Sequence, residues 1–70
     1  MMYEYNGTIY NLKKFARFDK MDGMYKGKRY PYIEACTTVN RASSRANFIE
    51  FRFETEEERE NFLNKLLKKG

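Results

Sequence analysis

The sequence predicts an α+β domain, in which an antiparallel meander of about five short strands is packed by one C-terminal helix. Three observations carry this prediction: an Asn-Gly pair between two tyrosine-rich runs, an alternating segment NFIEFRF, and a capped amphipathic segment at the end of the chain. The 70 residues form a single small domain, residues 1–70. A domain of this length buries only about 60% of the surface that its unfolded chain exposes, so its core is thin.

The first two strands are expected over residues 1–5 and 8–12, where the runs YEY and TIY flank Asn6-Gly7. Asn-Gly tolerates the positive φ angles of a type I′ turn, which closes a two-residue hairpin. Because side chains alternate along a strand, this register gathers several apolar residues on one face. These are Tyr3, Tyr5, Tyr10 and Leu12.

Residues 12–20 fit two structures. Leu12, Phe15 and Ala16 lie at helical spacing, whereas residues 15–20 can form a strand after a tight corner. We favour the strand, because the segment lies between a hairpin and another strand and a short helix needs a longer connection to return. The helix stays open as the alternative.

A turn-rich connection is expected next, because Asp22-Gly23 and Lys26-Gly27 are turn-forming pairs. β-Branched and aromatic residues then predict a strand over residues 30–39, with Pro31 at its start or on an edge. The polar run RASSRA is expected to form a loop before the fifth strand, residues 47–53. Alternation along that strand turns three residues toward the core: Ile49, Phe51 and Phe53.

The C-terminal helix is expected over residues 55–69. Thr55 and Glu58 form a capping box, in which the threonine hydroxyl accepts from a first-turn amide and the glutamate reaches back to the Thr55 amide. Glutamates open the helix and lysines close it, so both ends of the helix dipole meet opposite charge. The apolar stripe consists of Phe62, Leu63, Leu66 and Leu67.

Composition argues against catalysis. The chain has no histidine and a single cysteine, Cys36, which is expected to be a small packed residue. Asp19 and Asp22 are expected to be solvated turn residues, and we predict no catalytic residue, no metal site, no cofactor and no small-molecule ligand. One cysteine and the lack of a signal peptide or a membrane-spanning run predict a cytoplasmic protein, in the cytoplasm of the host cell if a phage encodes it.

The leading functional hypothesis is a non-catalytic protein-binding module or a homodimer. Aromatic residues make up 17% of the chain, more than one short helix can cover, so some of them are expected to contact a partner. The candidates for this interface are Tyr3, Tyr5, Tyr10, Tyr30, Tyr32 and Phe48. An inhibitor of a bacterial defence or host protein is one such module, since the short chain rich in Lys, Asn, Phe and Tyr is similar in style to small phage-encoded inhibitors.

The alternative hypothesis is a small basic nucleic-acid-binding protein. The formal net charge is +4, which favours polyanions. In an up-and-down meander, the glutamates that open the helix lie at the same end as Lys26, Lys28 and Arg29 and partly cancel their field. The opposite end is expected to gather cations with few acids nearby, and its candidate residues are Lys13, Lys14, Arg41, Arg45, Lys65, Lys68 and Lys69.

A basic five-stranded sheet with a C-terminal helix resembles the small archaeal chromatin proteins with an SH3-like barrel. The hairpin YEYNGTIY and the terminal FLNKLLKK hold the corresponding places. The resemblance implies DNA binding, but the chain has no tryptophan, and the strand that carries the family's DNA-reading residues has no counterpart here. No site residue is therefore transferred from that family.

Overall fold

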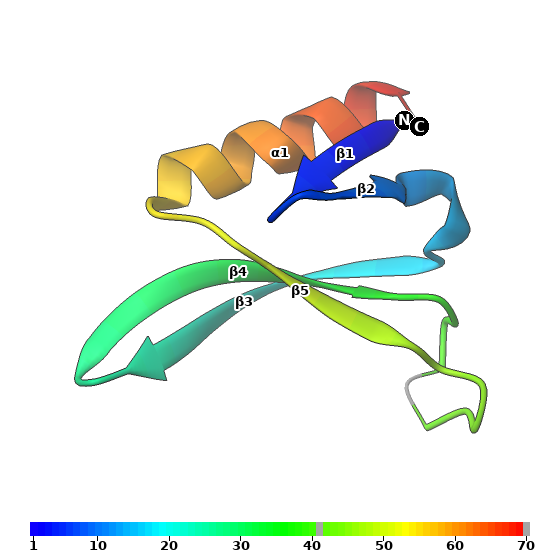
Figure 1. The fold of residues 1–70 in the computed structure, drawn as a ribbon, viewed down its shortest axis with the longest axis horizontal. Coiled ribbons are helices and arrows are strands. Elements are labelled where there is room, and N and C mark those ends of the chain that lie inside the picture. Colours follow the sequence, from blue (N-terminus) through cyan, green and yellow to red (C-terminus); the bar gives the residue numbers. More distant parts are fainter. Residues whose placement is uncertain (41, 70) are drawn as a thin grey trace.

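The structure is a computed structural model that describes residues 1–40 and 42–69. It confirms the α+β class, with five antiparallel strands followed by one C-terminal helix (Figure 1). Most ends of the predicted elements shift by one to three residues, but the third strand, predicted over residues 15–20, covers residues 17–25. Residues 12–14 form a short 3-10 helix. The elements are β1 (Met2–Tyr5), β2 (Thr8–Asn11), η1 (Leu12–Lys14), β3 (Arg17–Tyr25), β4 (Lys28–Cys36), β5 (Phe48–Arg52) and α1 (Glu56–Lys69).

The strands form two sheets and not one continuous meander. β1 pairs with β2 in a hairpin, and β3, β4 and β5 form a separate antiparallel sheet in that order. The 3-10 turn η1 redirects the chain between the two sheets, with the Asn11 side chain capping it and Leu12 buried beneath it. Figure 1 shows α1 and the β1–β2 hairpin side by side on the same face of the three-stranded sheet. We call this the inner face, and the opposite one the outer face.

Both hairpins turn at a pair of residues with positive φ. Asn6 and Gly7 have φ angles of 49° and 82°, and Lys26 and Gly27 have 51° and 79°, as a type I′ turn requires. The predicted turn at Asp22-Gly23 is wrong, because both residues lie inside β3. The Lys26-Gly27 turn alone closes the hairpin, so β3 and β4 run as a nine-residue pair, and its far end extends past the start of α1 (Figure 1).

The core lies between the inner face of the three-stranded sheet and the layer above it. Ile33, Ala35 and Phe51 are fully buried on the sheet, and Leu12 and Phe62 close the core from η1 and α1. The register explains this selection, since Ile33 lies opposite Phe51 on the neighbouring strand and both side chains point to the same face.

Phe51 is the centre of an aromatic cluster. Its ring centroid lies 5.2 Å from that of Tyr3, and 5.3 Å from those of Tyr5 and Tyr10, each in an edge-on arrangement. The Phe62 ring follows at 5.8 Å. Edge-on pairs of this kind add to the stabilisation that burial alone provides. The hairpin tyrosines therefore supply much of the apolar layer that holds β1 and β2 on the sheet.

The start of α1 is capped largely as the sequence predicts. The Glu58 amide donates to the Thr55 hydroxyl at 3.2 Å, while the Glu58 carboxylate accepts from the Glu54 amide and not from that of Thr55. The sequence did not predict the burial of one residue of this helix, Arg59. Arg59 is only 4% exposed, and its guanidinium donates to the Met21 carbonyl and, at 3.1 Å, to the Asp22 carboxylate. This contact ties the first turns of the helix to β3.

The burial of Tyr3 predicts a specific pH dependence. Desolvation raises the pKa of its phenol above the usual value near 10, and the neighbouring Tyr5 and Glu58 add to the rise. The folded state therefore prefers the neutral phenol. The stability linked to this preference is fully present below about pH 10 and is lost as the pH rises through the folded-state pKa. In urea unfolding from pH 9 to 11.5, the free energy of unfolding of Tyr3→Phe should fall less steeply with pH than that of the unmodified chain. Equal slopes of the free energy of unfolding against pH would contradict this linkage.

Candidate functional site

The outer face of the three-stranded sheet carries a cluster of tyrosines near the β3–β4 turn. Strand register places Gly23 opposite Tyr30 and Met21 opposite Tyr32, which in turn lies opposite Arg52. Directly opposed residues share a face, so these side chains lie on one surface together with the next pair on that face, Tyr25 and Lys28. We call it the tyrosine face, and it consists of Met21, Gly23, Tyr25, Lys28, Tyr30, Tyr32 and Arg52.

The Tyr30 ring lies across Gly23. A Cβ atom at position 23 would come within 2.3 Å of the Tyr30 ring, so only glycine leaves room for the ring in this position. The Tyr32 ring packs beside it at 5.6 Å between centroids, and the Arg52 guanidinium lies 4.9 Å from the Tyr30 centroid on the third strand. The aromatic ring is thus held from three sides by groups on three strands.

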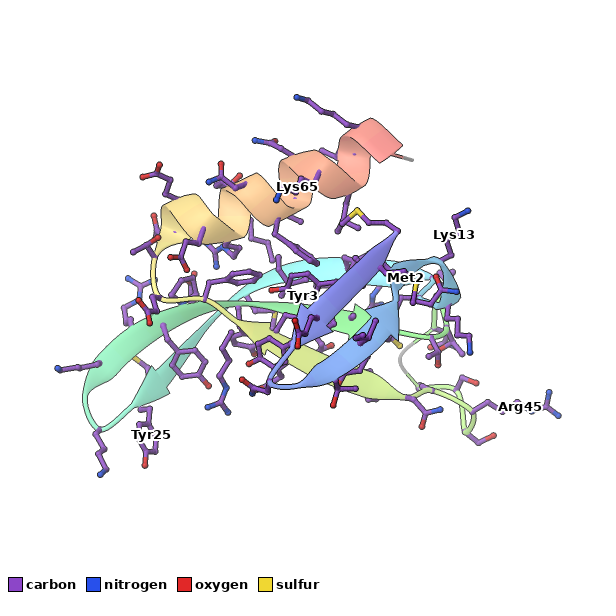
Figure 2. The ribbon with its side chains drawn as sticks, turned by 45° about the horizontal axis from the view of Figure 1, so that its top comes forward. Met2, Tyr3, Lys13, Tyr25, Arg45 and Lys65 are labelled. Atoms are coloured by element: carbon purple, nitrogen blue, oxygen red, sulfur yellow. The ribbon has the colours of Figure 1, made fainter. Side chains whose placement is uncertain are left out.

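Neither α1 nor the β1–β2 hairpin covers the tyrosine face, since both pack on the inner face. Tyr25 is 64% exposed, and Figure 2 shows it beside the β3–β4 turn, at the far end of the molecule from Lys13. Tyr30 and Tyr32 are half-buried by each other and by the strands below them. The face is therefore aromatic, ordered and accessible.

At the other end of the outer face, the residues that follow β4 contact Arg17 and Cys36. The Arg17 guanidinium donates to the Val39 carbonyl at 3.0 Å, and the Thr37 amide donates to the Asn47 carbonyl at 3.1 Å. Beneath this segment Cys36 is fully buried, with its sulfur 3.6 Å from the Thr38 hydroxyl. Cys36 is thus a packed residue, as the sequence suggests.

The six predicted interface residues divide between the two sides of the sheet. Tyr3, Tyr5 and Tyr10 face the core, where they pack around Phe51, and the Tyr5 hydroxyl also accepts from the Arg52 amide at 3.0 Å. The other three lie on the outer face. Tyr30 and Tyr32 belong to the tyrosine face, while Phe48 is 47% exposed at the other end of the sheet, opposite Cys36.

Sequence reasoning missed Tyr25, Gly23 and Arg52 as members of this surface. The placement of a turn at Asp22-Gly23 separated Tyr25 from the sheet. Once the hairpin is closed at Lys26-Gly27, counting back along both strands pairs Gly23 with Tyr30 and brings Tyr25 onto the same face. No local signal separates the two turn pairs, because Asp-Gly is itself a favoured type I′ pair, so the turn at Lys26-Gly27 depends on the pairing of the whole hairpin.

The predicted basic residues lie on three elements. Lys13 and Lys14 belong to η1, Arg45 to the segment after β4, and Lys65 and Lys68 to α1. These five are exposed, and none makes an ion pair with another described residue. Figure 2 shows Lys13 and Arg45 at one end of the molecule and Lys65 farther back along the helix. Arg41 and the side chain of Lys69 lie outside the described residues.

Several acidic residues on the described part of the chain form ion pairs with cations. Asp19 pairs with Arg17 at 2.7 Å, Glu60 with Lys20 at 2.6 Å, and Asp22 with Arg59 and Arg29. Within residues 1–40 and 42–69, no group of three or more Cys, Asp and Glu side chains is arranged to hold a metal ion. In the same residues, no helix is both long and apolar enough to cross a membrane.

Comparison of the chain with protein-family models, with curated proteins and with solved structures gives no match.

Proposed function

We propose that this chain is a non-catalytic module that binds a protein partner through the tyrosine face. The observation that carries the proposal is an ordered aromatic surface, with an arginine and a methionine among its tyrosines, which no helix or strand of the described chain covers. Tyr, Met and Arg are the residue types enriched at protein interfaces, and Tyr and Arg dominate binding hot spots. An inhibitor and an adaptor would both use such a surface.

The arrangement of the rings supports tight binding to a partner. Tyr30 is held by Gly23, Tyr32 and Arg52 before any partner arrives. Association otherwise costs roughly 0.5–1.5 kcal/mol for each mobile side chain that becomes fixed, and much of that cost is already met here by the fold. The tyrosine face therefore resembles a preformed binding surface more than a set of solvated side chains.

The charges around the tyrosine face favour protein over nucleic acid. Carboxylates accompany the cations on the outer face, where Glu50 lies 3.4 Å from Arg52 and Asp19 lies 2.7 Å from Arg17. These acids would repel a phosphate backbone, whereas a protein surface can present complementary groups of both signs.

Site-specific photocrosslinking tests the proposal directly. A photoreactive phenylalanine derivative in place of Tyr25 should give discrete protein adducts in lysate of the source organism, because this position is exposed within the expected interface. The matched control places the same group at Ile9, an exposed apolar position on β2 at 66% exposure. Adducts from position 25 and not from position 9 support the tyrosine face. No adducts, or the same adducts from both positions, would contradict it.

Two substitutions then test the geometry of the face. Tyr30→Ala removes the central ring, and Gly23→Ala places a Cβ where that ring now lies, so both should reduce the yield of the Tyr25 adducts about tenfold. Thermal unfolding should show both variants folded. Because the two changes act on the same ring, their combination should lower the yield no further than Tyr30→Ala alone, and additive losses would show that Gly23 acts in another way.

Nucleic-acid binding at the opposite end is a second candidate function. It is favoured by one observation, namely that Lys13, Lys14 and Arg45 are exposed cations that form no ion pair with any residue the structure describes. Such binding should weaken steeply as salt rises from 50 to 500 mM, because phosphate contacts release counterions. Titration of fluorescent single- and double-stranded oligonucleotides measures it, and unchanged affinity after replacing all three residues with glutamate would exclude it.

A further inference from the structure

An apolar groove lies on the side of the molecule away from the tyrosine face. It has a volume of about 890 Å³ and runs between the second half of α1, the first residues of the chain, η1 and the start of β3. Its apolar lining includes Met2, Leu12, Phe18, Leu63, Leu66 and Leu67. The groove is thus built from four separate segments that the fold brings together.

Two residues of this groove are far more exposed than their apolar character favours. Leu67 is 79% exposed, although the sequence places it on the stripe of α1 that should face the core, and Met2 is 62% exposed. Leu66 takes the inward position on the last turn of the helix, which leaves Leu67 on the groove side. Exposed apolar residues that line one concave surface are typical of interaction sites.

Positive charge lines and flanks the groove. Lys13 lies in its wall, and Figure 2 shows it at the same end of the molecule as Met2. Lys14 and Lys68 are the exposed neighbours of this wall in η1 and on α1, and none of the three has an ion-pair partner among the described residues. The acid in the lining, Glu60, is neutralised by Lys20 at 2.6 Å. The unpaired charge at the groove is therefore positive.

We propose that this groove binds an acidic amphipathic helix of another protein, at a site separate from the tyrosine face. The helix residues that line the groove run from Glu60 to Leu67, which corresponds to about 11 Å along α1 or two turns of a docked helix. Apolar side chains of such a helix at i, i+3, i+4 and i+7 would contact Leu63, Leu67 and Met2. Its carboxylates would face the unpaired lysines.

Nucleic acid fits this groove less well. Base stacking needs exposed aromatic rings, but the exposed apolar groups here are the aliphatic side chains of Leu67 and Met2. Phe18 contributes to the lining only as a half-buried residue that packs on the core. The combination of aliphatic anchors and lysines is the complement of an acidic peptide.

The test uses a fluorescent 18-residue peptide with a leucine stripe at helical spacing and glutamates on its other face. Fluorescence anisotropy should show saturable binding that weakens several-fold between 50 and 500 mM NaCl. Leu67→Glu should weaken binding at least about tenfold and Lys13→Glu about fivefold. Both positions are exposed, so circular dichroism should show an unchanged fold. The matched controls Ile9→Glu and Lys26→Glu alter equally exposed residues outside the groove and should bind as the unmodified chain does.

Three results would overturn the proposal. The first is that the acidic peptide does not bind, or binds no more tightly than a scrambled peptide of the same composition. Tighter binding of a version with lysines in place of the glutamates would count in the same way. The second is that an oligonucleotide competes with the peptide and that its binding depends on Lys13 but not on Leu67. This result would make this end a nucleic-acid surface. The third is a dimer in sedimentation that Leu67→Glu dissociates, which would assign the groove to a second copy of the chain.

Discussion

Replacing Phe51 with alanine should remove roughly half of the free energy of unfolding of this domain. The substitution removes a fully buried ring with four aromatic neighbours at 5.2 to 5.8 Å between centroids. Truncation of a buried phenylalanine costs about 3–5 kcal/mol. A 70-residue domain has a free energy of unfolding of about 4–10 kcal/mol at roughly 0.05–0.15 kcal/mol per residue, so the loss is a large part of the total.

Urea unfolding followed by far-ultraviolet circular dichroism measures this loss. Phe48→Ala is the matched control, because it makes the same change on the same strand at a side chain that points to the outer face and is 47% exposed. The control should lose roughly 1 kcal/mol. If both variants lost the same amount, the aromatic cluster around Phe51 would not be the centre of the core.

Arg59→Met should cost the next largest amount of stability. Methionine keeps the apolar stem of the side chain but removes the guanidinium, which leaves the Met21 carbonyl without this donor and Asp22 without its buried partner. A buried polar group that loses its partner costs about 1–3 kcal/mol. Because the contact ties α1 to β3, unfolding should begin with release of the helix, visible as faster amide exchange in α1 than in β4.

Lys20→Met is the control for this prediction. Lys20 pairs with Glu60 at 2.6 Å, a shorter distance than the 3.1 Å between Arg59 and Asp22, but its side chain is half exposed. Exposed ion pairs contribute only about 0–1 kcal/mol, and salt screens them. In 1 M NaCl the effect of Lys20→Met should disappear while that of Arg59→Met persists. Equal salt sensitivity of the two would show that Arg59 acts as a surface charge.

Local sequence signals were sufficient for most elements of the fold. Asn6-Gly7 specifies the first hairpin, the alternation around Phe51 specifies the fifth strand, and the capping residues around Thr55 specify the start of the helix. Each of these signals depends on neighbours within about four residues, so the sequence alone can display them.

The features that escaped prediction depend on contacts between distant parts of the chain. The division into two sheets requires the 3-10 turn at Leu12, whose burial is decided by the sheet beneath it. Arg59 looks like an ordinary helix surface residue until β3 supplies a carbonyl and a carboxylate. Leu67 looks like a core residue until Leu66 takes the inward position.

The candidate site was predicted in part for the same reason. Tyr30 and Tyr32 were expected to contact a partner, and both lie on an open face, but the equally aromatic Tyr3 lies in the core. Alternation within a strand shows which residues share a face, yet it does not show which face receives the helix. That choice follows from the packing of the whole domain.

The position of the Tyr30 ring over Gly23 also limits how this sequence can diverge. A side chain at position 23 excludes the present position of the Tyr30 ring, although the two residues are seven apart and neither is needed for the turn. In a family of related chains the two positions should therefore vary together, with glycine retained only where position 30 is aromatic. A pair that breaks this rule would mark a lineage in which the outer face has taken a different shape and a different partner.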